Sequence, residues 1–487
     1  PTNSPNPNKK LSFTKITSFL SARSNVVASV LVAVVVAAVG WTVLQSRAAT
    51  PKPSPVPQAP TNLRAFTGGK DIAILWNVSQ SSTGIKQYNV YRDVKLIARV
   101  TPPKDSTYLT ANGTRYYDAN VQAGKTYSYQ ISTTDSNGIT SGLSRPVSVT
   151  QPAKSSAVPT ITVDASAATD LTATLNQGKA TLLTWYPKLA NALAWPDYTP
   201  PVSFTLKADP KYTGVAYTSG TTIVVSATYL REHPKDMGMF VHEATHVIQQ
   251  YAAYSPKFIV EGMADWTRET MFNDRNPAAP GAKAVYNDGY GTSAYFLEWL
   301  RSTYKAPNLV RSLNITAHNG GSYASVLAGA TGGKTVGQLW TQLTGRNVSS
   351  LGPVTGVGSR CLDLLNYSTT NGNTIQLLNC AKNSAQDWLK AAEPASASVA
   401  SGPFSLRVLG KCMDVKYSGK TAGTPVWIWD CNGSTAQQWV PQANGTLKNV
   451  NSGMCLQTKA GASTNGTPLE IAPCTASAAQ KWKLPPL

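Results

Sequence analysis

Residues 241–250 have the sequence VHEATHVIQQ and contain the most informative motif of the 487-residue chain. In a helix, His242 and His246 lie four positions apart on one face, so both imidazoles can bind one metal ion. Glu243 lies beside them as a carboxylate that can act as a general base on a bound water. The chain has only 4 histidines, so we favour a zinc site over a surface helix with two unused histidines.

A second buried helix is predicted at Phe258–Trp266 (FIVEGMADW). Glu261 follows His246 by fifteen residues and shares a helix face with Asp265, four positions further on. Zinc needs a third protein ligand, and Glu261 is favoured because its longer side chain reaches across a gap between helices. Asp265 then orients a ligand histidine. Exchanged roles, or two solvated carboxylates without a metal, are the alternatives.

The surrounding pattern predicts an α+β domain over residues 153–346. Apolar residues have helical spacing over Thr172–Leu193, and Val202–Leu206 and Thr222–Val225 resemble strands. Helical patterns then dominate as far as Leu343. The chemistry is therefore expected in a mixed domain that contains no cysteine.

The two motifs resemble the basic secretory protein family, zinc peptidases of gluzincin character. HEATHVIQQY at 242–251 and FIVEGMADWTR at 258–268 carry the resemblance. It continues in GVAYTS at 214–219, GYGTSAYFL at 289–297 and GKTVGQLW at 333–340, and so covers about 190 residues. It implies a zincin-like metallopeptidase that binds Zn²⁺ and hydrolyses peptide bonds.

Peptide hydrolysis also requires a donor that stabilises the tetrahedral oxyanion. Tyr290 is the first candidate, because it lies in a glycine-flanked turn at the head of a predicted helix. Tyr295 and His233 are alternatives, and each of the three could instead be a packing or loop residue. His318 precedes Asn-Gly-Gly and is expected in a loop.

All six cysteines lie in the last third of the chain, and taken in order they form three pairs with a spacing of 19 residues. An even number at a repeated spacing predicts three local disulfides and an oxidising compartment. The predicted bridges are Cys361–Cys380, Cys412–Cys431 and Cys455–Cys474.

Each cysteine pair is followed by a Gln-x-Trp triplet, at 386–388, 437–439 and 480–482. Three such units resemble the ricin-type β-trefoil lectin over residues 347–487. The resemblance implies sugar sites built from an Asp two residues after the first cysteine, an aromatic residue two before the second, and nearby polar groups. These sites bind glycans in the family.

The three repeats differ at those positions. Repeat two has Asp414 and Trp429, with Trp427 in the polar position, and is predicted to be the main sugar site. Repeat one has Asp363 and Gln376 but Leu378 as its platform, which predicts a weaker site. Repeat three has Gln457 and Ala472 and is expected to have lost binding. A trefoil that serves only for packing is the alternative.

The N-terminal region predicts export. Residues 26–44 carry no charge and would span about 28 Å as a helix. Residues 1–25 contain basic residues and no acidic ones, so they are expected to stay cytoplasmic. A transmembrane anchor is favoured over a cleavable signal peptide, for which Ala48 and Ala49 would suit. Residues 50–60 form a proline-rich linker.

Residues 61–150 alternate apolar and polar residues between turn signals, which predicts a β-sandwich. PTNLRAF at 60–66, Trp76, the YNVYR segment at 88–92 and the YSYQIS segment at 127–132 resemble a fibronectin type III domain. No catalytic residue is recognisable there, and we expect a spacer module.

Composition excludes one class of partner. The formal net charge of +19 is spread over all segments, whereas a nucleic-acid-binding protein should concentrate it in a patch. The sequence thus predicts a multidomain extracytoplasmic protein, membrane-anchored or secreted. Its function is that of a zinc metallopeptidase for peptide or protein substrates, directed to glycans by its lectin domain. The alternative is a glycan-binding adhesin with an inactive or structural metal domain.

Overall fold

The computed structural model describes residues 56–102, 113–153, 157–251, 253–273, 277–393 and 398–487. The predicted basic segment, the membrane anchor or signal peptide and the first part of the proline-rich linker lie outside these ranges. Within the described ranges, no helix has the length and apolar character needed to cross a membrane.

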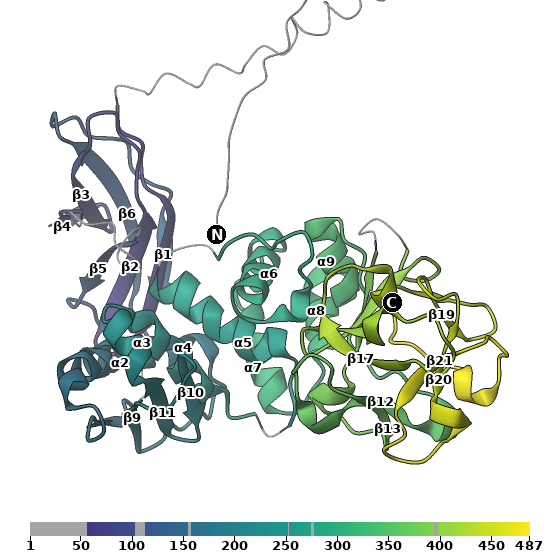
Figure 1. Ribbon diagram of the computed structural model, residues 1–487. Coiled ribbons are helices and arrows are strands. Elements are labelled where there is room, and N and C mark those ends of the chain that lie inside the picture. Colours follow the sequence, from purple (N-terminus) through teal and green to yellow (C-terminus); the bar gives the residue numbers. More distant parts are fainter. Residues whose placement is uncertain (1–55, 103–112, 154–156, 252, 274–276, 394–397) are drawn as a thin grey trace, which may run out of the picture. The chain divides into compact units, whose positions relative to one another are not determined.

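Residues 61–150 form two antiparallel sheets (Figure 1). One has the order β1-β2-β5 and comprises β1 Thr61–Gly68, β2 Asp71–Asn77 and β5 Gly113–Asp118. The other has the order β4-β3-β6-β7 and comprises β3 Ile85–Arg92, β4 Lys95–Val100, β6 Thr126–Asp135 and β7 Val147–Thr150. Ile72, Ile74 and Trp76 of the first sheet share a core with Tyr88 and Tyr129 of the second. This packing agrees with the predicted β-sandwich.

The central region contains a four-stranded sheet of order β10-β11-β9-β8. Its strands are β8 Thr160–Asp164, β9 Ser203–Asp209, β10 Ala216–Ser219 and β11 Thr222–Ser226. The strands β8, β9 and β11 are parallel, whereas β10 pairs antiparallel with β11. In the described sheet, β10 is therefore an edge strand.

Helices pack on this sheet and extend the central region (Figure 1). They are η1 Thr169–Leu171, α2 Thr172–Leu193, α3 Ala227–Glu232, α4 Met237–Gln249, α5 Lys257–Trp266, the π-helix η2 Thr267–Phe272, η3 Tyr286–Asp288, α6 Tyr290–Thr303, α7 Leu309–His318, α8 Tyr323–Thr331 and α9 Val336–Thr344. Helix α2 has the predicted bounds. His318 ends α7, so its expected place in a loop is wrong.

The β-sandwich is joined to the central region by buried contacts. Ala73 and Leu75 of β2 belong to the hydrophobic core that α2 and α4 build. Lys188 of α2 is 1% exposed and donates to the Asp71 carboxylate and to the Gly68 carbonyl. The Arg64 guanidinium donates to the Thr270 carbonyl at 2.6 Å. A spacer would keep its surface in water, so the expected spacer role is corrected to that of a packed domain.

The C-terminal region consists of short strands. They are β12 Cys361–Leu364, β13 Ile375–Leu378, β14 Leu389–Ala392, β15 Phe404–Val408, β16 Lys411–Val415, β17 Pro425–Asp430, β18 Trp439–Pro441, β19 Leu447–Asn449, β20 Cys455–Thr458 and β21 Leu469–Ala472. Short 3₁₀ turns precede, separate and follow these strands, at η4 Val357–Ser359, η5 Leu365–Tyr367, η6 Ser384–Gln386, η7 Lys416–Ser418, η8 Thr435–Gln437, η9 Lys459–Gly461 and η10 Ala478–Gln480. Strands β14 to β21 form one sheet, and β12 pairs with β13.

The internal repeat is visible in equivalent contacts. The three predicted disulfides are all present, each closing a separation of 19 residues. Each Gln-x-Trp indole donates to the backbone carbonyl 26 positions earlier, and these pairs are Trp388 to Leu362, Trp439 to Met413 and Trp482 to Leu456. The triplets therefore secure one β-hairpin in each repeat.

Candidate metal centre and active site

Helices α4 and α5 bring three potential metal ligands together. The Nε2 atoms of His242 and His246 lie 3.2 Å apart. The Oε2 atom of Glu261 lies 3.4 Å from the first and 3.8 Å from the second. Tetrahedral ligands at about 2.0–2.1 Å from Zn²⁺ are about 3.3 Å apart. The triangle of donors therefore has a size and chemistry that suit zinc.

The second nitrogen of each histidine has its own acceptor. His242 Nδ1 lies 2.7 Å from Asp265 Oδ1, and His246 Nδ1 lies 2.8 Å from Gln249 Oε1. In the metal-binding form, with a proton on each Nδ1, the two Nε2 atoms are the ligand atoms next to Glu261. Asp265 thus contacts the Nδ1 side of the His242 ring and Glu261 the Nε2 side. This arrangement favours Glu261 as the metal ligand and Asp265 as the residue that orients His242, rather than the exchanged roles.

Burial and neighbouring charges shift the pKa values of His242 and Glu261. Burial lowers the pKa of His242, but hydrogen bonds to Asp265 and Glu261 outweigh this effect and raise that pKa to about 9. Burial raises the pKa of Glu261, and contact with His242 together with the charge of His246 brings it below its usual range. The carboxylate is therefore held in its charged form, which is the form that binds a metal.

Glu243 is buried next to the metal-ligand candidates, and a residue of the sheet fixes its position. The hydroxyl of Thr218 on β10 donates to Glu243 Oε2 at 2.7 Å and lies 3.0 Å from the Glu243 carbonyl oxygen. Only one oxygen of the carboxylate has this donor. Thr218 therefore fixes both the carboxylate and the backbone of Glu243 to β10.

A cleft of about 1030 Å³ opens over these groups. Its walls include β10 residues 216–218, the three metal-ligand candidates, Glu243 and Tyr290. Tyr290 begins α6, has a backbone φ of 45° and is half exposed. Its ring lies 6.1 Å from that of His242. Burial, and then the charges of Glu261, Asp265 and Glu243, raise the pKa of Tyr290 to about 12, so the phenol stays a proton donor.

The alternative oxyanion donors lie elsewhere. Tyr295 is inside α6, and His233 follows α3 as its C-cap residue, where its ring contacts Tyr229. Neither residue lines the cleft. Of the three candidates, Tyr290 alone is in the cleft as described.

In the C-terminal region, repeat two has an aromatic surface. Trp427 and Trp429 stack at 5.3 Å between ring centres, and Tyr417, 81% exposed, meets Trp427 edge-on at 5.2 Å. The Trp427 indole donates to Asp414 Oδ1 at 3.0 Å. Burial raises the pKa of Asp414, and this hydrogen bond partly offsets the effect. The predicted pair Asp414 and Trp429 thus lies in one aromatic and acidic cluster.

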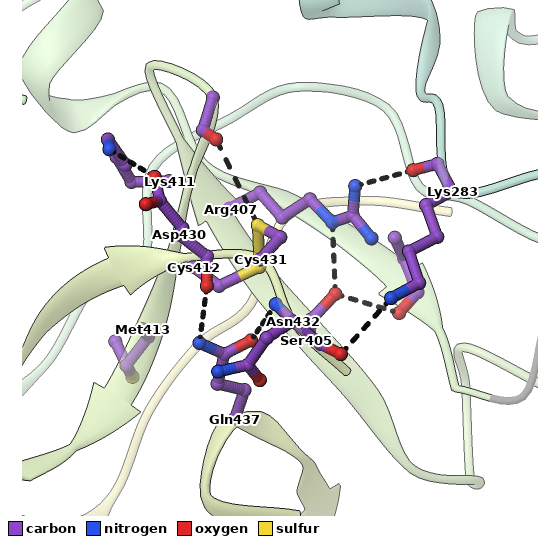
Figure 2. The surroundings of a disulfide bond; sticks show 12 residues. Lys283, Ser405, Arg407, Lys411, Cys412, Met413, Asp430, Cys431, Asn432 and Gln437 are labelled. Carbon is purple, nitrogen blue, oxygen red and sulfur yellow. Dashed lines mark hydrogen bonds and ion pairs between the residues drawn. A yellow bond between two sulfur atoms is a disulfide. The ribbon is translucent and has the colours of Figure 1, made fainter. Parts of the chain in front are cut away.

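Figure 2 shows how the disulfide of repeat two supports this hairpin. Cys412 and Cys431 join β16 to the end of β17. Beside the bridge, Gln437 donates to the Asp430 carbonyl at 2.8 Å and accepts from the Asn432 amide at 3.0 Å. The Gln of the triplet therefore closes the turn after the second cysteine.

In the other repeats the equivalent positions also make internal contacts. Both carboxylate oxygens of Asp363 accept side-chain amides, from Gln376 and Gln386, each at 3.1 Å. In repeat three, Gln457 donates to Glu470 at 3.2 Å and accepts from Gln480 at 3.0 Å. Repeat one, predicted as the weaker site, has its acidic group occupied in this way.

Comparison with family models agrees with both resemblances. Residues 160–343 match the model described as a peptidase of plants and bacteria. Residues 400–486 match the ricin-type beta-trefoil lectin domain. The first match indicates a hydrolase-type domain and includes every residue of the metal centre. The second begins after repeat one and supports carbohydrate binding. Both segments lie within the predicted domains, and the recognition of the two families is confirmed.

Some solved structures are similar to a part of this chain. The designed three-fold symmetric protein ThreeFoil is 22% identical over 28% of this chain and 97% of its own, with a TM-score of 0.25. The agglutinin from Abrus precatorius is 25% identical over 28% of this chain, with a TM-score of 0.23. A non-toxic homologue of type II RIPs from Momordica charantia is 21% identical over 29%, with a TM-score of 0.24. The likeness spans 48% of each of these two plant chains. A search of curated proteins finds no match.

Two residues of the centre were not predicted. Thr218 lies within the recognised GVAYTS segment, but only the folded sheet places its hydroxyl against Glu243. Gln249 follows His246 by three positions, so helical spacing puts both on one face. That spacing was the available signal for Gln249.

Proposed function

We propose that the protein is an extracytoplasmic zinc peptidase whose C-terminal lectin domain binds glycans. The convergence of His242, His246 and Glu261 on one point carries the proposal. The peptidase-family match supports hydrolysis, and three disulfides support an oxidising compartment. Zn²⁺ bound by His242, His246 and Glu261 would supply an activated water and would polarise the scissile carbonyl.

The protein's own groups divide the remaining tasks. Glu243 accepts the proton of the attacking water on Oε1, the oxygen that Thr218 does not contact, and delivers it to the leaving amine. Thr218 keeps the other oxygen fixed, so the carboxylate cannot rotate away. Tyr290, at the wall of the cleft, donates to the oxyanion. Tyr290 suits this role because its raised pKa keeps the phenol protonated and able to donate.

The edge strand β10 gives the cleft a means of holding a peptide. In the described sheet its outer edge lacks a neighbouring strand, and residues 216–218 line the cleft beside Glu243. An extended peptide can add to such an edge through main-chain hydrogen bonds. The scissile carbonyl of that peptide would then lie next to the proposed base.

The lectin domain would concentrate the peptidase on glycan-bearing proteins or polysaccharide. Its best-equipped repeat is the second, where Trp429 offers a flat face and Asp414 a charged acceptor. We further propose that residues 61–150 are a fibronectin type III-like domain and that residues 26–44 anchor or export the chain. The localisation is thus the cell surface or the extracellular medium.

The test measures zinc content and protease activity of the same preparations. The full chain should hold one zinc and cleave an unfolded protein substrate. His246→Ala and Glu261→Ala should lose the metal, whereas Glu243→Gln should retain it and lose activity. Glu232→Gln, an exposed carboxylate on α3, is the matched control and should change neither property.

Each result separates the proposal from its rival. Zinc retained by both ligand variants would refute the ligand assignment. A wild-type protein that binds glycans and zinc but cleaves no peptide would support the glycan-binding adhesin with a structural metal domain.

A further inference from the structure

Gln249, the last residue of α4, joins two parts of the metal centre. It is 3% exposed. Its Oε1 lies 2.8 Å from His246 Nδ1, and its Nε2 donates to the Val260 carbonyl at 2.9 Å. One side chain therefore contacts a ligand histidine on α4 and the backbone next to Glu261 on α5.

The first contact determines the tautomer of His246. A neutral imidazole has one N–H and one lone pair, and only the lone pair can bind a metal. An acceptor opposite Nδ1 keeps the proton there and leaves Nε2, which faces His242 and Glu261, as the ligand. An amide can also be a donor, but here its NH₂ group is directed to the Val260 carbonyl, so its oxygen has to face the histidine.

The second contact determines distance. Helix α4 ends at Gln249 and α5 begins at Lys257, so Val260 belongs to the next helix. The amide bridges α4 to the residue before Glu261. It therefore holds the 3.8 Å separation between His246 Nε2 and Glu261 Oε2.

We propose that Gln249 is a positioning residue that prepares the site for zinc, by holding the tautomer of His246 and the spacing of His246 and Glu261. This inference rests on the proposed function, because it assumes that the centre binds zinc. It goes beyond that function by assigning part of the metal affinity to a residue that does not touch the metal.

A second buried link starts from the same helix, α4, and provides a matched control. The Thr245 hydroxyl lies 2.7 Å from the Thr267 hydroxyl at the start of η2, and Thr245 is fully buried. It lies on α4 next to His246 in sequence, yet it does not line the cleft. Thr245→Val removes an interhelical hydrogen bond without changing the surroundings of the ligands.

The experiment measures the zinc dissociation constant by competition with a chelator, together with the melting temperature of the metal-free protein. Gln249→Met keeps the length of the side chain and loses both hydrogen bonds. Loss of a comparable outer contact weakens metal binding about 10- to 100-fold, and we expect that range. Gln249→Glu restores an acceptor for His246 and should bind zinc more tightly than Gln249→Met. Thr245→Val should bind zinc like the wild type.

The outcomes are distinguishable. If Gln249→Met binds zinc within twofold of the wild type, or if Thr245→Val weakens binding as much, the inference is overturned. If Gln249→Glu is no better than Gln249→Met, the tautomer argument is overturned. A wild-type protein without zinc would contradict the proposed function itself, which is a separate result.

Discussion

Repeat two should dominate glycan binding, and paired substitutions in repeats one and two can test this. Asp414→Ala removes a charged acceptor from the aromatic cluster, and Asp363→Ala removes the equivalent carboxylate of repeat one. A hydrogen bond to a charged group contributes about 1.5–3 kcal/mol. Asp414→Ala should therefore raise the glycan dissociation constant about ten- to a hundredfold.

The structure predicts a different consequence for Asp363→Ala. Both oxygens of Asp363 accept amides from within the repeat, so its removal leaves buried donors without their acceptor. Such a loss costs about 1–3 kcal/mol of folding free energy. We expect a melting temperature lower by several degrees and a nearly unchanged glycan affinity.

The assay is a glycan array with the full chain, followed by titration of each variant with the best ligand and by thermal denaturation. Asp414→Asn separates the two effects, because its amide oxygen can still accept the Trp427 indole while the charge is gone. It should weaken binding but preserve the melting temperature. A larger loss of affinity in Asp363→Ala than in Asp414→Ala would refute the prediction that repeat two is the main sugar site. If no glycan binds, the alternative holds that the C-terminal domain serves only for packing.

Three further predictions follow from single contacts. Thr218→Val should lower kcat about tenfold or more, because the hydrogen bond to the charged Glu243 carboxylate is lost. Thr218→Ser keeps the hydroxyl and should have a kcat close to that of the wild type. Equal kcat values for the two variants would contradict the positioning role of Thr218. Replacing Cys412 and Cys431 by Ser should cost about 3 kcal/mol of stability in urea unfolding, and a bridge between repeats in a peptide map would contradict the pairing. Burial raises the pKa of Asp387 to about 6, above the pKa of an aspartate in the unfolded chain. The protonated carboxyl therefore contributes its full stabilisation below about pH 4, and this contribution is lost as the pH rises through about 6. Asp387→Asn should remove that slope from unfolding free energies measured between pH 4 and 7, and an unchanged slope would count against it.

Local patterns predicted much of this protein. The helix carrying His242 and His246, the helix over Thr172–Leu193 and the three disulfides all follow from spacing along the chain. Each depends on residues within about twenty positions of one another, where the helical period or a repeated loop length limits the possibilities. The lectin repeats were visible for the same reason, since each unit repeats one short pattern.

Contacts between distant segments were decided only by tertiary packing. Sequence spacing put Glu261 and Asp265 on one helix face but left their roles exchangeable; the approach of α5 to α4 placed Glu261 at the Nε2 atoms and Asp265 behind His242. Likewise, the apolar face of β2 gave no sign that Ala73 and Leu75 would enter the core of the central region. Helical period and loop closure are properties of a short segment, whereas the partner of a buried face depends on how all apolar surfaces of the chain are covered at once.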